Sequence, residues 1–379
     1  MSRWRRHALG TQPPPVPICR GCHLRPAPPD CRRHGEDKGI RFIIYGLGAV
    51  GGTLAAALVR SGQSVAGIAR GAMLEALRAD GLLFRTPAGA ERLHFPVHAG
   101  PHEIAFADGD VAILTMKSQD TADALLALRD AGFGDRPVLC AQNGVNNERL
   151  ALRHFARVYA VTVMTPADYT VPGEVACFGT PRHALLDIGR YPSGADATLA
   201  EIAAALTAAN LAVTTMDDVM QSKYGKLVEN LGNVVEAAAG REQASLDRLG
   251  SALPGESDAD VIARIMVVVR AEAELVYRAA GIRRLDVGWA SERRRGVMEM
   301  GAVEGYSRVG GSSTQSLSRG AGRIETDYLN GEIVLLGRLH GVPAPVNAAL
   351  CEVGRELAAA AAGPGSIAPA ELARRLGLY

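Results

Sequence analysis

Lysine is the residue type in this sequence that stands out as a candidate for proton chemistry. The chain carries 41 Lys and Arg side chains, yet lysine occurs only at positions 38, 117, 223 and 226. Arginine supplies the other positive charges, so a retained lysine indicates a position that arginine cannot serve. An ammonium group is compact and its pKa can shift, whereas a guanidinium stays protonated. Lys117 and Lys226 are therefore candidate functional residues, and we expect replacement of Lys223 by Arg to be neutral.

Lys226 begins a polar stripe in the segment KLVENLGNVVEA, residues 226–237, which we predict to be one helix. Asn230 and Asn233 follow it at i+4 and i+7, so the three side chains share a face. A polar stripe usually faces solvent, but asparagine is a poor helix former with no reason to repeat there. We favour a polar lining for an oxygenated ligand over a solvated face. An ammonium in such a site could stabilise and protonate the alkoxide that forms when a ketone accepts a hydride.

A glycine-rich turn supplies the matching cofactor chemistry. Residues 42–45 are an apolar run typical of a strand buried on both faces, and Gly46, Gly48 and Gly51 follow with GxGxxG spacing before a helical segment. In a strand–turn–helix unit these glycines permit the tight turn, the approach of a pyrophosphate and close helix packing. We therefore predict dinucleotide binding here; the alternative is a glycine-rich surface turn.

The residue after the second predicted strand, 64–69, indicates which dinucleotide is bound. NAD-binding units commonly carry Asp or Glu there for the ribose 2′-hydroxyl, whereas this chain has Arg70. A cation suits a 2′-phosphate, so NADP(H) is favoured over NAD(H). The alternative is an exposed loop arginine.

Further polar residues follow later elements. Lys117 comes directly after a predicted strand, and Asn143 ends the next one, so both are expected at the carboxyl edge of the sheet near the cofactor. A hydroxyl-rich segment, Ser312 to Thr314, is predicted to be a loop that leads into a helix carrying Glu325. Its hydroxyls could bind a carboxylate, although a loop of this composition is more often a linker.

The elements that position these residues alternate between strand and helix up to about residue 216. The predicted strands are 41–46, 64–69, 111–116, 137–142, 158–164 and 211–216, with 174–179 and 184–189 as a late antiparallel addition. This order predicts an α/β fold: an N-terminal Rossmann-type, doubly wound parallel sheet followed by an all-α C-terminal domain. The predicted parts are a disordered extension 1–38, an NADP-binding domain 39–216, a helical substrate and catalytic domain 217–362, and a tail 363–379.

Composition narrows the function classes. The chain has 379 residues, a formal net charge of +1 and no apolar run of 18 residues, which argues against nucleic acid or a membrane as a partner. No secretory signal is visible, and the widely separated Cys140, Cys177 and Cys351 suit reduced thiols, so we expect a cytoplasmic protein.

The Pro- and Arg-rich residues 1–38 contain two metal-related patterns. CRGCH, residues 19–23, matches a c-type haem attachment motif, and Cys19, Cys22, Cys31 and His34 have zinc-like spacing. No export signal or periodic element accompanies them, so we expect no metal site and expect deletion of 1–38 to leave folding and activity unchanged.

Together, GLGAVG, Arg70, Lys117, the Asn-Gly pair at 143–144, KLVENLGNVVEA and IETDYLNGEI…HGVPAPVN resemble the ketopantoate reductases (2-dehydropantoate 2-reductases) over residues 41–360. The resemblance implies a Rossmann domain, a helical domain and a cleft between them, with NADPH reducing a 2-oxo acid. It implies Lys226 as general acid, Glu325 at the catalytic end, and Asn230, Asn233 and Ser313 at the substrate. The implied cofactor residues are Gly46, Leu47, Gly48, Ala49, Val50, Gly51, Arg70, Lys117, Asn143 and Ala167.

Three functions follow from this resemblance. The first is NADPH-dependent reduction of 2-dehydropantoate to pantoate in pantothenate biosynthesis. The second is reduction of another carbonyl compound, because the second asparagine of the substrate helix is displaced by one position and lacks the proline that commonly follows it in the family. The third is a non-catalytic NADP sensor. The partner is a small 2-oxo acid in the first reading, and the helical domain is compatible with a homodimer.

Overall fold

The apolar run at residues 42–45 forms an inner strand of the main sheet in the computed structural model, which describes residues 39–240, 257–288, 290–320 and 322–379. All of these belong to one compact unit, 39–379. The predicted disordered extension 1–38, with its cysteine and histidine pattern, lies outside the described residues. Among the helices that are described, none is both long and apolar enough to cross a membrane.

The main sheet has eight strands in the order β13-β12-β8-β7-β6-β1-β2-β5. Its strands are β1 (Arg41–Tyr45), β2 (Ser64–Ile68), β5 (Val97–His98), β6 (Asp110–Leu114), β7 (Val138–Cys140), β8 (Val158–Met164), β12 (Leu185–Arg190) and β13 (Ala212–Thr215). Every neighbouring pair is parallel except β12 with β8, so the predicted parallel sheet is confirmed, and of the two strands predicted as a late antiparallel addition only the second, β12, joins it.

Helices cover both faces of this sheet, as the buried residues of β6 show. Val111 and Ile113 pack in the core that includes α1 and α5, whereas Ala112 and Leu114 pack in the core that includes α3. Successive strand residues point to opposite faces, so each face needs its own helix layer. The helices of this part are α1 (Ala49–Arg60), α2 (Gly71–Asp80), α3 (Thr121–Asp130), α4 (Asn147–Leu152) and α5 (Ala197–Ala208), with short 3-10 turns at Pro101–Glu103 and Ser118–Asp120.

A second sheet, of four strands, was not predicted as a unit. It has the order β4-β3-β10-β9 and consists of β3 (Leu82–Thr86), β4 (Gly89–Leu93), β9 (Ala167–Asp168) and β10 (Glu174–Cys177). The predicted strand 174–179 therefore divides between β10 and β11 (Gly179–Pro181), and neither joins the main sheet. β11 pairs with β14 (Met298–Met300), the single strand of the described residues after 217.

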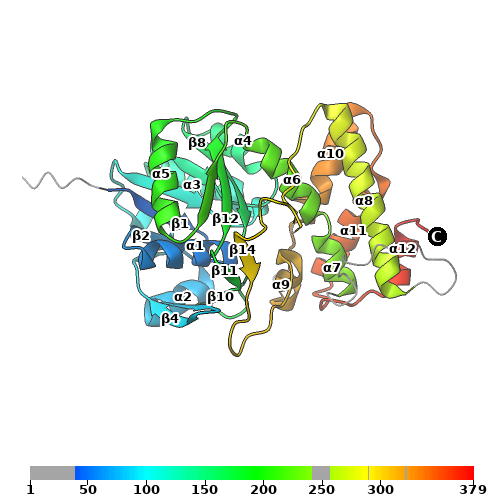
Figure 1. Cartoon of the computed structure of the whole chain (residues 1–379), viewed down its shortest axis with the longest axis horizontal. Coiled ribbons are helices and arrows are strands. Elements are labelled where there is room, and N and C mark those ends of the chain that lie inside the picture. The colour runs from blue at the N-terminus through cyan, green and yellow to red at the C-terminus, as the bar shows by residue number, and fades with distance from the viewer. Residues whose placement is uncertain (1–38, 241–256, 289, 321) are drawn as a thin grey trace, which may run out of the picture. The chain divides into compact units, whose positions relative to one another are not determined.

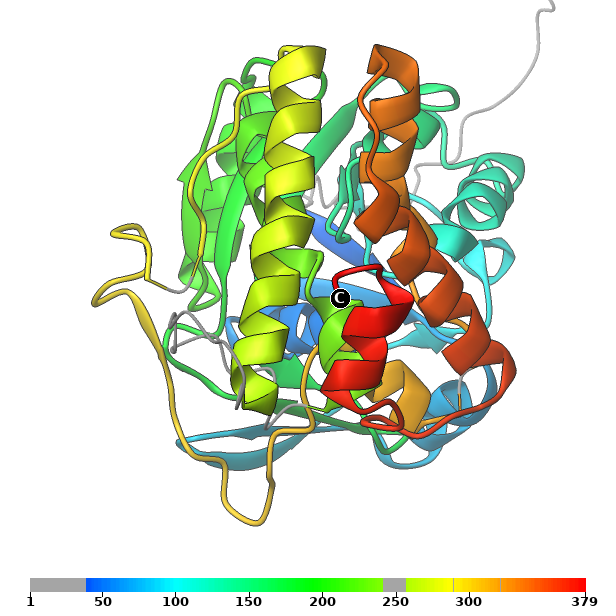
Figure 2. The same ribbon diagram turned by 90° about the vertical axis from the view of Figure 1, so that its right-hand side faces the viewer.

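The chain after residue 217 is helical, as predicted. Its elements are α6 (Met220–Asn230), α7 (Asn233–Ala239), α8 (Asp258–Ala280), α9 (Ser312–Ser318), a 3-10 turn (Thr326–Tyr328), α10 (Asn330–His340), α11 (Pro345–Ala359) and α12 (Pro369–Arg375). In Figure 1 the main sheet and its helices lie on one side, and α8 with α10 to α12 lie on the other. Figure 2 faces this helical side, where α12 (red) lies between α8 and the orange helices α10 and α11. Leu372 and Leu376 bury α12 in the helical core, so the segment predicted as a tail is packed.

Two local predictions about the helical part are wrong. Residues 226–237 form two helices, because a turn at Leu231 and Gly232 separates α6 from α7. The hydroxyl-rich segment is not a loop: it forms α9, in which Ser316 Oγ donates to the Ser312 carbonyl at 2.8 Å. Hydroxyl groups that bond the carbonyl four residues back are compatible with a helix, which explains the difference.

Candidate active site

A cleft of about 290 Å³ lies where α6, the start of α1 and the residues before α9 meet. The predicted site residues that line it together are Ala49, Val50, Asn143, Ala167, Lys226, Asn230 and Asn233. Helix α6 can present its polar stripe here because Leu227, Val228 and Leu231 bury its other face in the helical core. The break before α7 does not remove Asn233 from the cleft.

The ammonium of Lys226 is tuned by its surroundings. The side chain is half-buried on the cleft wall. Burial lowers its pKa from the usual value to about 8; Arg294 and Arg308 add to this shift, and Glu229 opposes it. A group with this pKa is mostly protonated at neutral pH and still able to release its proton, which suits a general acid.

Two donors that have no hydrogen-bond partner in the described part of the chain face the same cleft. Asn230 is only 5% exposed, and its side-chain amide nitrogen has no hydrogen-bond partner among the described residues. The hydroxyl of Ser312 is likewise buried without a partner among them. Because a buried donor without a partner costs about 1–3 kcal/mol, these groups are suited to a ligand oxygen. Ser312 lines the cleft, whereas the predicted Ser313 is buried outside its lining.

The glycine turn has the geometry that a dinucleotide needs. Gly46 has a φ of +102°, and a Cβ there would lie 2.8 Å from the backbone nitrogen of Met116. A Cβ on Gly51 would lie 1.9 Å from the carbonyl oxygen of Gly46, so α1 packs against the turn itself. A Cβ on Gly48 would meet its nearest atom, on the Tyr169 ring, only at 3.9 Å. The backbone of Gly48 is therefore open to a pyrophosphate at the N-terminus of the 12-residue helix α1. Leu47 between them is buried in the core of the sheet part.

The remaining predicted residues lie outside the cleft lining. Arg70 follows β2, is exposed, and pairs with Asp120 at 2.8 Å. Lys117 donates to the Ser316 hydroxyl of α9, and burial lowers its pKa while Glu325 opposes the shift. The carboxylate of Glu325 accepts from the backbone N–H of Ser118 at 2.9 Å, and burial raises its pKa.

Sequence reasoning missed several cleft residues. These are Glu229, Glu236, Arg294, Arg308 and Gln315. Glu229 and Glu236 share helices with the predicted stripe and could have been found from it, but the two arginines carry no local signal among 37 arginines.

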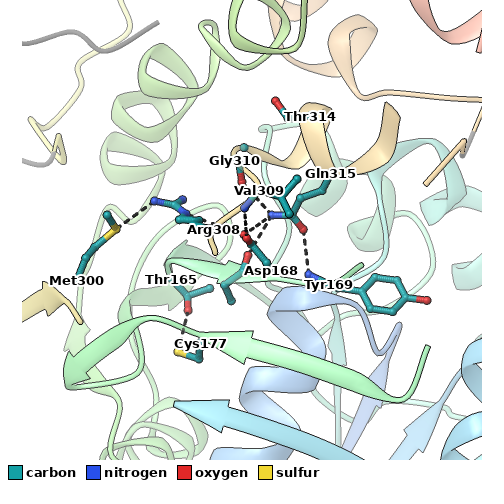
Figure 3. A network of polar contacts seen from close by, with 12 residues as sticks. Thr165, Asp168, Tyr169, Cys177, Met300, Arg308, Val309, Gly310, Thr314 and Gln315 are labelled. Carbon is teal, nitrogen blue, oxygen red and sulfur yellow. Dashed lines mark hydrogen bonds and ion pairs between the residues drawn. The ribbon is translucent and has the colours of Figure 1, made fainter. Parts of the chain in front are cut away.

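A buried carboxylate holds part of this cleft together (Figure 3). Asp168, completely buried on β9, accepts from Gln315 Nε2 at 2.9 Å and from the Val309 backbone N–H at 2.5 Å, and lies 3.9 Å from Arg308 Nε. Gln315 also donates to the carbonyls of Ala167 and Gly310. These contacts tie residues 308–315 to the sheet part and so fix the wall on which Ser312 lies.

Lys223 has a different role from the one expected. Its Nζ lies 2.7 Å from Glu148 Oε1 and donates to the Gln142 carbonyl at 2.7 Å, and both charged side chains are buried. This burial argues against the expectation that Lys223→Arg is neutral, because a larger guanidinium would have to enter the packed core. The retained lysine at this position therefore reflects structure.

Comparison with known proteins adds independent findings. The family model described as "Ketopantoate reductase PanE/ApbA" matches residues 42–192, and the model of its C-terminal part matches residues 255–358. A 2-dehydropantoate 2-reductase of Pyrococcus horikoshii is 28% identical over 308 residues, covering 81% of this chain and 94% of the relative. A solved PanE/ApbA family ketopantoate reductase from Ralstonia eutropha JMP134 is also 28% identical, with a TM-score of 0.67 over 85% of this chain and 99% of that one. D-mandelate dehydrogenase, solved with NADH and anilino(oxo)acetate, has a TM-score of 0.68 over 85% and 99% of the two chains but 20% identity, so this likeness concerns the fold.

Proposed function

The chain belongs to the ketopantoate reductase family of oxidoreductases, and from this premise we propose that it uses NADPH to reduce 2-dehydropantoate to pantoate. The observation that carries the proposal is one shared cleft: Lys226 and Asn230 of α6 line it together with Ala49 and Val50 at the start of α1. A proton donor and an amide donor thus lie beside the turn suited to a dinucleotide. We include a cytoplasmic location and a homodimer in the proposal.

The glycine turn and the N-terminus of α1 would hold the pyrophosphate of the cofactor, and Arg70 would hold the 2′-phosphate that distinguishes NADPH. When bound, the nicotinamide supplies the hydride to the carbonyl carbon. Lys226 donates its Nζ proton to the alkoxide oxygen that forms, and so ends the step as a neutral amine. Asn230 orients the substrate by donating to one of its oxygens, while Val235, Ile262 and Met266 keep the cleft wall apolar.

The other predicted residues have supporting roles in this proposal. Asn233 and Ser312, in place of Ser313, contribute polar groups to the substrate end of the cleft. Asn143 and Ala167 contact the cofactor from the cleft wall. Lys117 and Glu325 act from behind that wall. Lys117 donates to Ser316 of α9, and Glu325 accepts from the backbone N–H of Ser118, the residue after Lys117. We retain the division into a cofactor domain up to 216 and a helical domain from 217, with α12 now included in the latter.

A substrate screen tests this function. The purified full chain is mixed with NADPH or NADH and with a panel of 2-oxo acids, including 2-dehydropantoate, and loss of reduced cofactor is followed by absorbance. We expect turnover of 2-dehydropantoate with NADPH and slower turnover with NADH. Faster reduction of a different 2-oxo acid would make that acid the assigned substrate in place of 2-dehydropantoate. If no member of the panel causes oxidation of NADPH or NADH, the proposed function is overturned.

A further inference from the structure

The cleft carries an excess of positive charge. Its lining includes the cations Lys226, Arg294 and Arg308 and the carboxylates Glu229 and Glu236. Three cations against two carboxylates leave a formal charge of +1 on the lining. A small cleft with a positive wall concentrates anions, so its chemistry favours a negatively charged ligand.

The two carboxylates of the cleft also serve the protein. Glu236 Oε1 accepts from the backbone N–H of Gly311 at 2.8 Å and thereby holds the entrance to α9. Glu229 Oε2 lies 3.6 Å from Arg270 on α8. Each carboxylate of the lining thus has a partner of its own in the protein, while the formal charge of the lining stays at +1.

The arginines differ in where they lie. Arg308 is close to Asp168 and donates to the sulfur of Met300, so it belongs to the network that holds residues 308–315. Arg294 is only 3% exposed and lines the cleft from a turn between α8 and β14. That turn is anchored to the sheet part, because Arg293 pairs with Asp187 of β12 and Met298 is buried.

We propose that Arg294 binds the carboxylate of the substrate in this cleft and makes the enzyme selective for 2-oxo acids over neutral ketones. The inference rests on the proposed reduction of a 2-oxo acid and assigns its charged end to a residue outside the family resemblance. A guanidinium can bind a carboxylate through two parallel N–H···O bonds, which orients the substrate as well as attracting it. Burial lowers the pKa of Arg294 to about 10, so the group is still cationic at neutral pH.

This placement couples substrate binding to the proton donor. The charged groups that act on Lys226 are Arg294, Glu229 and Arg308, and among them Arg294 has the largest effect, lowering the pKa of the ammonium. A carboxylate bound to Arg294 offsets this repulsion, and the pKa of Lys226 rises. The substrate therefore helps Lys226 to keep its proton until the alkoxide needs it.

The test compares a 2-oxo acid with its primary amide, which keeps the ketone and removes the charge. The variants are Arg294→Gln, Arg294→Lys and, as matched control, Arg295→Gln, because Arg295 is the exposed neighbour. We measure kcat/KM for acid and amide across pH with NADPH saturating. Thermal melting of each variant checks folding, and the acid-to-amide ratio does not depend on the amount of folded enzyme.

We expect Arg294→Gln to lower the acid-to-amide ratio about 10- to 150-fold, the range for a hydrogen bond to a charged group. The pH at which kcat/KM falls should move up, because Lys226 loses a cationic neighbour. In Arg294→Lys, kcat/KM should fall at the same pH as in the wild type, and the acid-to-amide ratio should decrease by less than in Arg294→Gln. Arg295→Gln should match the wild type in both measurements.

An unchanged acid-to-amide ratio together with an unchanged pH profile in Arg294→Gln would overturn the inference while leaving the reductase function in place. A wild-type enzyme that reduces the amide as well as the acid would overturn it as well. Absence of turnover of every 2-oxo acid by the wild type would instead overturn the proposed function, and the inference with it.

Discussion

Replacement of Lys226 by Arg separates charge from proton donation. The variant keeps a cation on α6 and nearly the same helix propensity, so the fold should persist. Burial lowers the pKa of Lys226 to about 8, whereas a buried arginine in the same cleft, Arg294, keeps a pKa of about 10. Arginine at this position cannot release a proton near neutral pH.

The size of the effect follows from the loss of the proton donor. A positioned general acid contributes about 10²–10⁴ in rate, and Lys226→Arg removes this contribution. We expect kcat to fall about 10²- to 10⁴-fold in Lys226→Arg. NADPH affinity should stay within a few-fold, because Lys226 is on α6 and the glycine turn precedes α1.

The pH dependence provides a second readout with a defined sign. The reactive form is the ammonium, and its pKa is lowered from the usual lysine value, so wild-type kcat/KM should fall as pH rises through about 8. In Lys226→Arg the fall near pH 8 should disappear, because a guanidinium stays protonated well above that pH. The assay is steady-state turnover between pH 6 and pH 10, roughly the span around that pKa, with NADPH binding followed by fluorescence.

The control variant is Arg295→Lys, which exchanges the same two residue types at an exposed position. We expect it to leave kcat and the pH dependence unchanged. Turnover of Lys226→Arg within about tenfold of the wild type, with the same fall above pH 8, would remove Lys226 from the acid role.

Three further perturbations test other parts of the molecule. Arg70→Asp should erase or invert the preference for NADPH, a change of about 10- to 150-fold in the ratio of kcat/KM for the two cofactors, and equal use of both by the wild type would contradict the assignment. Lys223→Met should lower the free energy of unfolding by about 3–5 kcal/mol in urea titrations, because it leaves the buried Glu148 carboxylate without its cation; a loss below about 1 kcal/mol would argue against a buried pair. Gly51→Ala should lower the free energy of unfolding by about 1–3 kcal/mol and weaken NADPH binding, because its Cβ would lie 1.9 Å from the Gly46 oxygen. Gly363→Ala should change neither, because a Cβ there would have no atom of the described residues within 4 Å.

Local patterns were sufficient for much of the fold. The apolar run before Gly46, the glycine spacing and the helical segment after it all lie within about twenty residues, and the structure has β1, the turn and α1 there. The polar stripe from Lys226 to Asn233 also lies within two helical turns, and its residues do line one cleft. Periodicity reports such arrangements because it depends only on neighbours in sequence.

Other features depended on packing that no local pattern encodes. The hairpin β3–β4 joins β10 across about ninety residues, and this pairing moves residues 174–177 from the main sheet into a second one. Gly232 lies in the turn between α6 and α7, where a Cβ would lie 3.0 Å from Met266 of α8.

The site residues divide in the same way. Whether Ser312 or Ser313 reaches the cleft depends on where α9 begins, and that is set by Gln315 and Gly311 binding Asp168 and Glu236 on other elements. Arg294 and Arg308 reach Lys226 from segments about 70 and 80 residues away, and only the folded chain brings their charges close enough to shift its pKa. Residue type and short spacing are local properties, so the sequence alone was enough to single out Lys226, Asn230 and the glycine turn. The tertiary structure alone decided which of them act on one another, because burial and charge–charge distances exist only after the chain has packed.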